Sequence, residues 1–235
     1  MKLQIERAAI DTLMIRLFDR IEEGNMPWLL AASQRLRRQF GDQLIDLVPS
    51  YTTLMLHYDL RQLDENNARE SVITALAGLQ PLPSEHAGRR HEIAVWYDPS
   101  VGPDLQRLSG LTGLDVSRVI ALHSNHEYQV FALGFAPGFA YMGLLDERLA
   151  APRLATPRKR APAGSVAIAE RQTAAYPLAS PGGWNLVGRT PAQLFDRDRD
   201  GYSLLQPGDR VQFVPVEHAE FVRLGGDDTL VPGDA

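Results

Sequence analysis

The sequence contains no cysteine and no surplus of positive charge. Without cysteine, disulfides and thiolate catalysis are excluded, and any zinc site would need histidine and carboxylate ligands. A formal net charge of −5 gives no overall attraction for nucleic acid or for anionic lipid. These absences leave an ordinary globular chain of 235 residues, in which 44% of residues are hydrophobic.

Long hydrophobic runs are also scarce. Residues 128–145 carry no charged side chain and reach the ~18 residues of a membrane-spanning helix. However, Gly134, Pro137, Gly138 and Gly143 would break such a helix repeatedly. The first residues, "MKLQIERAAIDT", contain no apolar run of the signal-peptide type. We therefore expect no membrane association and a cytoplasmic location.

Up to residue 85, the sequence predicts two strands, a helix, two more strands and a second helix. Apolar and polar residues alternate along the expected strands, and Trp28, Leu29, Ala32, Leu36 and Phe40 recur at helical spacing. This ββαββα order predicts a small α/β domain over residues 1–85, with an antiparallel sheet and both helices on one face. The expected strands are 3–8, 12–18, 44–50 and 52–59. Asp64 or Asn66 is expected to cap the second helix, which ends near Gly78.

Beyond residues 79–92, which resemble a linker, the pattern changes. A strand is expected at 92–98, and a helix with a short helical turn before residue 124. From Tyr128 to residue 216, short apolar runs alternate with proline and glycine, which is typical of a barrel or a sandwich. The chain is thus predicted to be α+β. Residues 226–235 have little apolar content, and we expect a flexible tail.

Several familiar site motifs are incomplete. The run "DRDRDG" (196–201) resembles the start of a calcium loop, but Pro207 stands where the twelfth-position carboxylate is needed. His123 and His126 have a ligand-like spacing without further ligands tied to them by pattern. No phosphate-binding glycine–lysine loop and no G-x-S-x-G elbow is present. We expect no intrinsic metal.

Two bends combine small residues with aromatic rings. "GFAPGFAYMG" (134–143) places three rings near one turn, and in "SPGGWNLVGRT" (180–190) Trp184 follows a Pro-Gly-Gly turn. Between the bends lie Gln172, Thr173 and Tyr176, which suit a small polar ligand. Small residues allow close approach while rings supply flat apolar walls, so the bends form either the lip of a groove or a compact barrel corner.

The run from His123 to Thr190 resembles the family of allophanate hydrolase subunit 1, Kip inhibitor and the B-type subunit of 5-oxoprolinase. The resemblance lies in "H....Y.V..LGF.PGF.YMG.L" (123–144), "PR...PAGSVAIA..QT..YP" (157–177) and "SPGGWNLVGRTP" (180–191). Residues 48–59 and 204–216 extend it over nearly the whole chain. It implies that residues 90–225 form a cyclophilin-like β-barrel domain after the small N-terminal domain.

The resemblance also implies an activity. The chain is expected to be a non-autonomous subunit of ATP-dependent 5-oxoprolinase, a hydrolase complex that opens the lactam of 5-oxoproline to L-glutamate. Its partners would be a second cyclophilin-like protein, the C-type subunit, and a TIM-barrel-like protein, the A-type subunit. ATP would be a co-substrate of the complex, either with or without magnesium. The sequence contains no lysine motif for the attachment of biotin. The alternatives are a histidine-kinase inhibitor of the Kip type and an allophanate or urea carboxylase-related subunit.

Carried onto this chain, the resemblance implies a groove between the two bends. No catalytic residue is assigned. Arg158 and Arg189 are candidate clamps for an anion, and His123 either donates to a carbonyl or caps a strand. The expected groove residues are Phe135, Pro137, Phe139, Tyr141, Arg158, Gln172, Thr173, Tyr176, Trp184 and Arg189.

Overall fold

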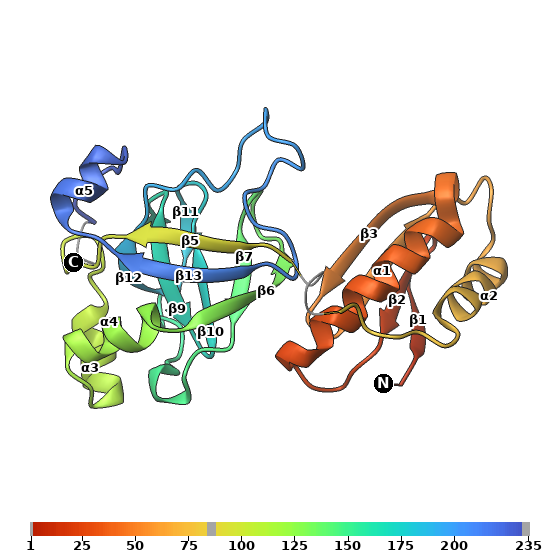
Figure 1. The fold of residues 1–235 in the computed structure, drawn as a ribbon, viewed down its shortest axis with the longest axis horizontal. Coiled ribbons are helices and arrows are strands. Elements are labelled where there is room, and N and C mark those ends of the chain that lie inside the picture. Colours follow the sequence, from red (N-terminus) through yellow and green to blue (C-terminus); the bar gives the residue numbers. More distant parts are fainter. Residues whose placement is uncertain (1, 84–87, 232–235) are drawn as a thin grey trace. The chain divides into compact units, whose positions relative to one another are not determined.

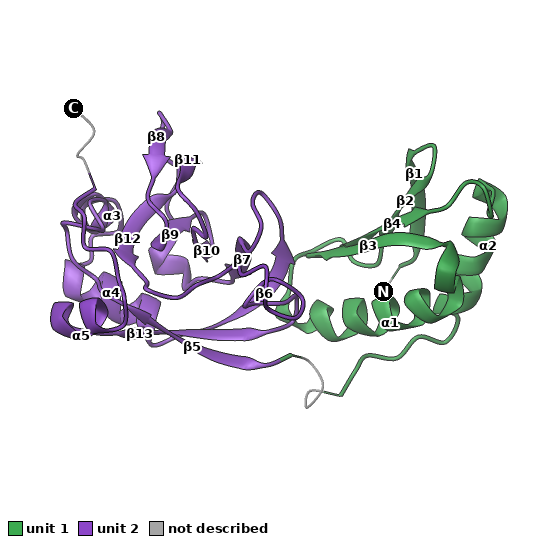
Figure 2. Ribbon diagram, turned by 90° about the horizontal axis from the view of Figure 1, so that it is seen from above, with its two compact units in different colours: residues 1–88 green, residues 89–235 purple. Residues whose placement is uncertain are grey.

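The computed structural model describes residues 2–83 and 88–231 and divides the chain into two compact units, residues 1–88 and 89–235 (Figure 2). The expected linker falls partly on residues 84–87, and the expected tail partly on 232–235, which lie outside the described residues. The fold is mixed α/β. None of the helices among the described residues is both long and apolar enough to cross a bilayer.

Unit 1 is a four-stranded antiparallel sheet, in the order β1-β2-β4-β3, with two helices (Figure 1). The chain forms it because alternate residues of the central strands are apolar and buried, including Leu13, Ile15, Leu54 and Leu56. Helix α1 packs against β3, β4 and α2. The bounds are β1 Gln4–Ala9, β2 Thr12–Arg16, α1 Met26–Phe40, β3 Leu44–Ser50, β4 Thr53–Tyr58 and α2 Glu65–Leu76, with 3-10 turns at Glu23–Asn25 and Gly41–Gln43.

Unit 2 is built on a seven-stranded, barrel-like sheet in the order β12-β9-β10-β7-β6-β13-β5. The two edge strands meet at one point, where the backbones of Trp96 and Arg189 exchange two hydrogen bonds of 2.9 Å, so the barrel is nearly closed. The predicted barrel is therefore confirmed. Its strands are β5 Arg90–Val95, β6 Glu127–Leu133, β7 Ala140–Gly143, β9 Ser165–Ala169, β10 Gln172–Ala175, β12 Asn185–Arg189 and β13 Arg210–Pro215.

Short elements surround this sheet. Strands β8 (Arg158–Ala161) and β11 (Ser180–Gly182) form a separate two-stranded ribbon. Helices α3 (Leu105–Thr112) and α4 (Val116–Ser124) precede β6, a 3-10 turn covers Glu147–Leu149, and α5 (His218–Arg223) follows β13. The sequence predicted one helix and a short turn before residue 124. Two helices form because Gly113, with a φ of 71°, ends the first and Asp115 caps the second.

The two faces of the barrel sheet carry separate apolar clusters. The interior cluster receives side chains from all seven strands, among them Val166, Ile168 and Phe213. The alternate residues of β9, Ala167 and Ala169, face outward and join a second cluster with Trp184. A residue's place in the strand therefore decides which cluster it enters. This division determines which predicted site residues can meet.

Candidate functional site

The loop between β6 and β7 folds back on itself and presents one aromatic ring to solvent. The N–H of Gly134 donates to the carbonyl of Phe139 over 3.1 Å, and the N–H of Phe139 donates to the carbonyl of Ala136 over 3.0 Å. Phe135 adopts a φ of 68°, which costs a non-glycine residue about 1–3 kcal/mol, and its side chain is 62% exposed. The loop therefore holds an exposed aromatic ring in a strained backbone conformation.

The two ring-bearing bends meet on the outer face of the barrel. Phe139 packs edge to face against Tyr176 and Trp184, with ring centroids 5.3 and 5.9 Å apart. The rings of Tyr141 and Phe135 lie 4.9 and 5.2 Å from that of Phe139. We call these five residues the aromatic cluster. Phe139, Tyr176 and Trp184 are at most 5% exposed, so the rings themselves fill the space between the bends, and Phe135 forms the exposed edge.

Polar groups line one side of the aromatic cluster. The guanidinium of Arg153 lies 5.8 Å from the ring centroid of Trp184, a cation–π arrangement. Burial raises the pKa of the Tyr176 hydroxyl, and the backbone of Trp184 and the charge of Arg153 partly oppose that shift. Gly182 is required beside this hydroxyl, because a Cβ there would overlap it. The predicted turn at Pro181 and Gly182 is instead part of the short strand β11.

Arg158 is buried beneath this region and already has its anion. Its Nη1 and Nη2 donate to the two carboxylate oxygens of Asp104, each over 2.9 Å, in a fork-to-fork pair. The carboxylate also accepts the backbone N–H of Leu186 over 2.6 Å. Arg158 and Asp104 are 7% and 4% exposed. The expectation that Arg158 clamps a substrate anion is therefore corrected: its fork holds a carboxylate of the chain itself.

Arg189 is also buried, at 1% exposure. Its Nη1 donates to the carbonyls of Asp227 and Thr229 over 2.6 and 2.7 Å. Farther along, the N–H of Val231 donates to the carbonyl of Ser100 over 3.0 Å, and the Val231 side chain packs in the outer cluster. We call residues 227–231 the C-terminal strap. The part of the expected tail that the structure describes is thus packed on the barrel.

His123 lies in the barrel interior, away from the aromatic cluster. Its Nε2 lies 2.8 Å from the hydroxyl of Thr173, and its Nδ1 lies 2.7 Å from the hydroxyl of Tyr97. Thr173 donates its own proton to the carbonyl of Ala167, so it accepts from Nε2–H, and Tyr97 donates to Nδ1. Burial, with a smaller contribution from His126, lowers the pKa of His123 to about 3, so the ring is neutral.

Two further predicted residues have other positions. Pro137 is exposed at the tip of the 134–139 loop. Gln172 begins β10, where it opposes Ala169 and Gly143 in the sheet, and it is half-buried. The structure therefore brings together the five aromatic residues, but it places Thr173 and His123 on the opposite face of the sheet. One continuous groove through all the predicted residues does not form.

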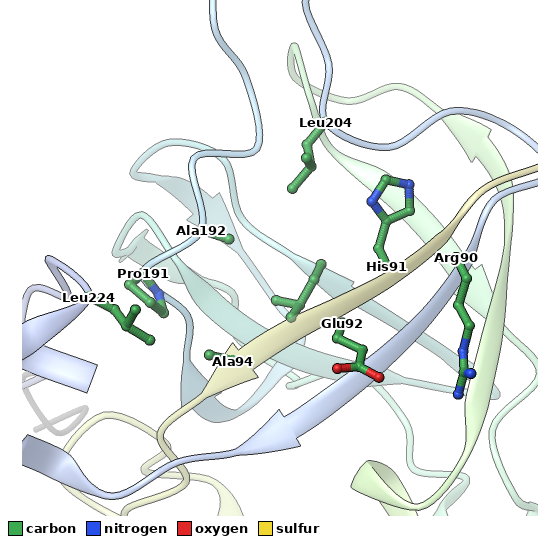
Figure 3. A pocket seen from close by; sticks show the side chains of 9 residues that line it. Arg90, His91, Glu92, Ala94, Pro191, Ala192, Leu204 and Leu224 are labelled. Carbon is green, nitrogen blue, oxygen red and sulfur yellow. The ribbon is translucent and has the colours of Figure 1, made fainter. Parts of the chain in front are cut away.

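A separate hollow of about 450 Å³ lies along β5 (Figure 3). His91 and Leu204 lie on one side of it, and Pro191, Ala192 and Leu224 on another. None of the predicted groove residues lines this hollow. The hollow is lined on one side by β5 and on another by residues that follow β12, about 100 residues later in the chain. Because these segments are far apart in sequence, no local pattern predicted the hollow.

Sequence reasoning missed the partners that define the roles of these residues. Asp104 binds Arg158, Tyr97 binds His123, Arg153 covers Trp184, and Ser165 lies opposite Arg189. Each partner is distant in sequence from its target or belongs to another strand. The only local signal was the Pro-Asp pair before α3, which is typical of a helix start and does not reveal a buried carboxylate.

Comparison with known proteins places these features in a family. Residues 3–205 match the family model described as "Carboxyltransferase domain, subdomain C and D". The chain is 36% identical over 227 residues to the B-type subunit of 5-oxoprolinase from Bacillus subtilis (strain 168), covering 93% of this chain and 95% of that protein. It is 52% identical over 131 residues to the protein of the same name from Escherichia coli O157:H7, covering 56% and 60%.

A solved structure extends the comparison. The crystal structure of TTHA0988 matches 88% of this chain with a TM-score of 0.76 and 38% sequence identity. The match covers 40% of that longer chain, so this chain corresponds to less than half of it. The family match over most of the sequence, together with the shared fold, shows that the chain belongs to the family of carboxyltransferase subdomains C and D, which includes the B-type subunits of 5-oxoprolinase.

Proposed function

We propose that the chain is a subunit of an ATP-dependent 5-oxoprolinase, which opens the lactam of 5-oxoproline to L-glutamate together with partner subunits. The observation that carries this proposal is the 36% identity to a B-type subunit of 5-oxoprolinase over 93% of this chain and 95% of that relative. A match of this extent includes both units and the aromatic cluster. The cyclophilin-like form of the barrel and a cytoplasmic location belong to the same proposal.

The chemistry explains why such a reaction needs several components. A five-membered lactam is a stable amide, and phosphorylation of its carbonyl oxygen by ATP converts it into a better electrophile. The complex must hold ATP and lactam in line and must neutralise the phosphate charge. In the described part of this chain, no group of three or more histidine and carboxylate side chains is placed to hold a metal ion. We derive no magnesium-dependent step from this chain.

The aromatic cluster suits a positioning role within the complex. Its inner rings are packed, while Phe135 and the cation of Arg153 are exposed at its edge. An apolar ring beside a cation can contact a small amide or a partner's surface without performing chemistry itself. We therefore propose that this chain is inactive alone and acts with two partners, the cyclophilin-like C-type subunit and the TIM-barrel-like A-type subunit.

Reconstitution tests the proposal. The chain is co-expressed with the two candidate partners, purified through a tag on one of them, and supplied with 5-oxoproline and ATP. We expect stoichiometric co-purification and L-glutamate release that is lost when any one component or ATP is omitted. Urea and allophanate serve as competing substrates in the same assay. Failure to form a complex, or turnover of urea in place of 5-oxoproline, would contradict the proposal.

A further inference from the structure

The guanidinium of Arg189 has a free edge inside the protein. Among the hydrogen bonds of residues 2–83 and 88–231, its Nη1 donates to two carbonyls of the C-terminal strap. Nε and Nη2 are fully buried and have no hydrogen-bond partner among the described residues. A buried donor without an acceptor is destabilising, and more so when the group is charged. The side chain is therefore missing an acceptor at that edge.

A second unpaired group lies beside it. The hydroxyl of Ser165 is buried and also lacks a hydrogen-bond partner within residues 2–83 and 88–231. Ser165 and Arg189 are directly opposed in the antiparallel pair of β9 and β12, so their side chains project from the same face of the sheet at neighbouring positions. Two adjacent strands thus carry buried, unpaired hydrogen-bond donors at neighbouring positions on one face of the sheet.

The geometry of the free edge indicates what kind of acceptor fits. Nε and Nη2 form the side of a guanidinium that grips the two oxygens of a carboxylate with parallel hydrogen bonds. The Ser165 hydroxyl can donate a third hydrogen bond. Gly164, at a φ of 77°, leaves room for the stem of Arg189, whose Cγ would lie 3.2 Å from a Cβ at that position.

Charge supports the same assignment. Burial lowers the pKa of Arg189, and the carboxylates of Asp227 and Asp228 oppose this shift from nearby. Within the described residues no ion pair joins either carboxylate to the guanidinium; Asp227 instead accepts hydrogen bonds from Thr229, and Asp228 lies 2.9 Å from Nε2 of His218. The strap therefore supplies partial compensation without a direct ion pair. A buried guanidinium that has no direct ion pair is stabilised by an anion placed on its free edge.

We propose that the Nε–Nη2 edge of Arg189 and the hydroxyl of Ser165 form a binding site for a carboxylate, enclosed by the C-terminal strap. The identity of its ligand rests on the proposed function: the carboxylate is then that of 5-oxoproline. The site lies on the same outer face as the aromatic cluster, and the strap extends from Arg189 to Val231 within that cluster's packing. Entry of the ligand requires the strap to lift.

Binding measurements on the purified full-length chain test this site without any catalysis. The probes are 5-oxoproline and 2-pyrrolidinone, which is the same ring without the carboxylate, together with inorganic phosphate. We expect calorimetric binding of 5-oxoproline and none of 2-pyrrolidinone, because only the former carries the charged group. Equal binding of the two rings, or tighter binding of phosphate, would overturn the carboxylate assignment.

Two variants locate the site. Arg189→Lys keeps the charge but removes the forked edge, and we expect it to weaken 5-oxoproline binding by about 100-fold. Ser165→Ala removes one donor and should weaken it by about tenfold. Arg171→Lys, at a partly exposed ion pair with Glu147, is the matched control and should bind normally. Melting curves check folding, and the milder Ser165→Ala remains informative if Arg189→Lys does not fold.

The assembled complex supplies the remaining readout. In the reconstituted 5-oxoprolinase, Ser165→Ala should raise KM for 5-oxoproline about tenfold with little change in kcat. If the isolated chain binds no carboxylate and this KM is unchanged, the inference fails while the proposed function stands. If the complex has no oxoprolinase activity but the chain still binds carboxylates through Arg189, the proposed function fails and the site remains.

Discussion

Phe139 and Trp184 pack edge to face, with ring centroids 5.9 Å apart, although one ends the 134–139 loop and the other precedes β12. Both rings are nearly fully buried, at 2% and 5% exposure. Their contact joins the two bends into one unit on the outer face of the barrel. The bends therefore form one packed unit, and Phe135 is its most exposed ring.

Phe139→Ala should destabilise the protein by about 3–5 kcal/mol, because it removes a buried ring that contacts four others. Urea unfolding measures the change. Phe135→Ala is the matched control and should cost less than about 1 kcal/mol, since that ring is 62% exposed. Similar losses for the two variants would contradict the division into a packed interior and an exposed edge.

Phe135→Gly should leave the stability equal or raise it by about 1 kcal/mol, because glycine adopts a φ of 68° without strain. If the ring serves the complex, the activity of the reconstituted oxoprolinase should fall at least tenfold. Tyr202→Gly is the matched control, since Tyr202 is 60% exposed and has a φ of 61°. We expect that control to keep full activity; equal activity in both variants would remove Phe135 from the contact surface.

Gly182→Ala should destabilise the protein by about 1–3 kcal/mol, because the new Cβ overlaps the Tyr176 hydroxyl. Tyr176→Phe removes that oxygen. The double variant should therefore lose less stability than the sum of the two single changes, although the Cβ would still be tight against the ring at 2.9–3.0 Å. A double-mutant cycle from thermal or urea unfolding gives the coupling. Simple additivity would show that the glycine is not required by this contact.

Arg158→Met should destabilise the protein by about 3–5 kcal/mol, because it leaves the carboxylate of Asp104 buried without its counter-ion. Combining it with Asp104→Asn should recover part of that loss, since the amide is neutral and still accepts the N–H of Leu186. Urea unfolding measures the stability of the single and the double variant. An unchanged midpoint for Arg158→Met, with activity lost, would restore the discarded role as a substrate clamp.

The lowered pKa of the buried His123 ring makes the stability of the protein depend on pH. Its pKa is lowered from about 6.5 to about 3 in the folded state, so below pH 6.5 the unfolded chain binds the additional proton. Stability is full above pH 6.5 and falls by about 1.4 kcal/mol per pH unit as the pH drops toward 3. His123→Asn has no titrating ring, so between pH 6 and 4 its unfolding free energy should fall less steeply than that of the wild type. Parallel slopes would contradict this assignment.

Local patterns identified much of the fold. The helical spacing of Leu29, Ala32, Leu36 and Phe40 lies within α1, and all four residues are buried. The side chain of Asp64 caps α2 by accepting the N–H of Asn67. Short apolar runs separated by glycine and proline indicated a barrel or a sandwich, because such runs are too short for helices and the glycine and proline residues between them favour turns. Each of these features depends on neighbours in the sequence.

The arrangement of the site could not be predicted in the same way. Whether a strand residue faces the interior or the outside depends on register, and a shift of one residue exchanges the faces. Thr173 thus turns toward His123 while Tyr176, three positions later, turns toward Phe139. Arg158 and Arg189 appeared equivalent as cations, yet one meets Asp104 and the other meets the C-terminal strap. These partners lie across the fold, beyond any local pattern.

The insertion of β13 between β6 and β5 affects how the protein is made. β5 begins at residue 90, but it pairs in parallel with a strand that ends at residue 215. On the ribosome, β5 must therefore wait for more than a hundred further residues before its sheet neighbour emerges, whereas every strand of unit 1 has its partner by residue 58. Nascent chains halted before residue 210 should leave β5 without its parallel neighbour, expose the apolar side chains of Ile93 and Val95, and become substrates for chaperones.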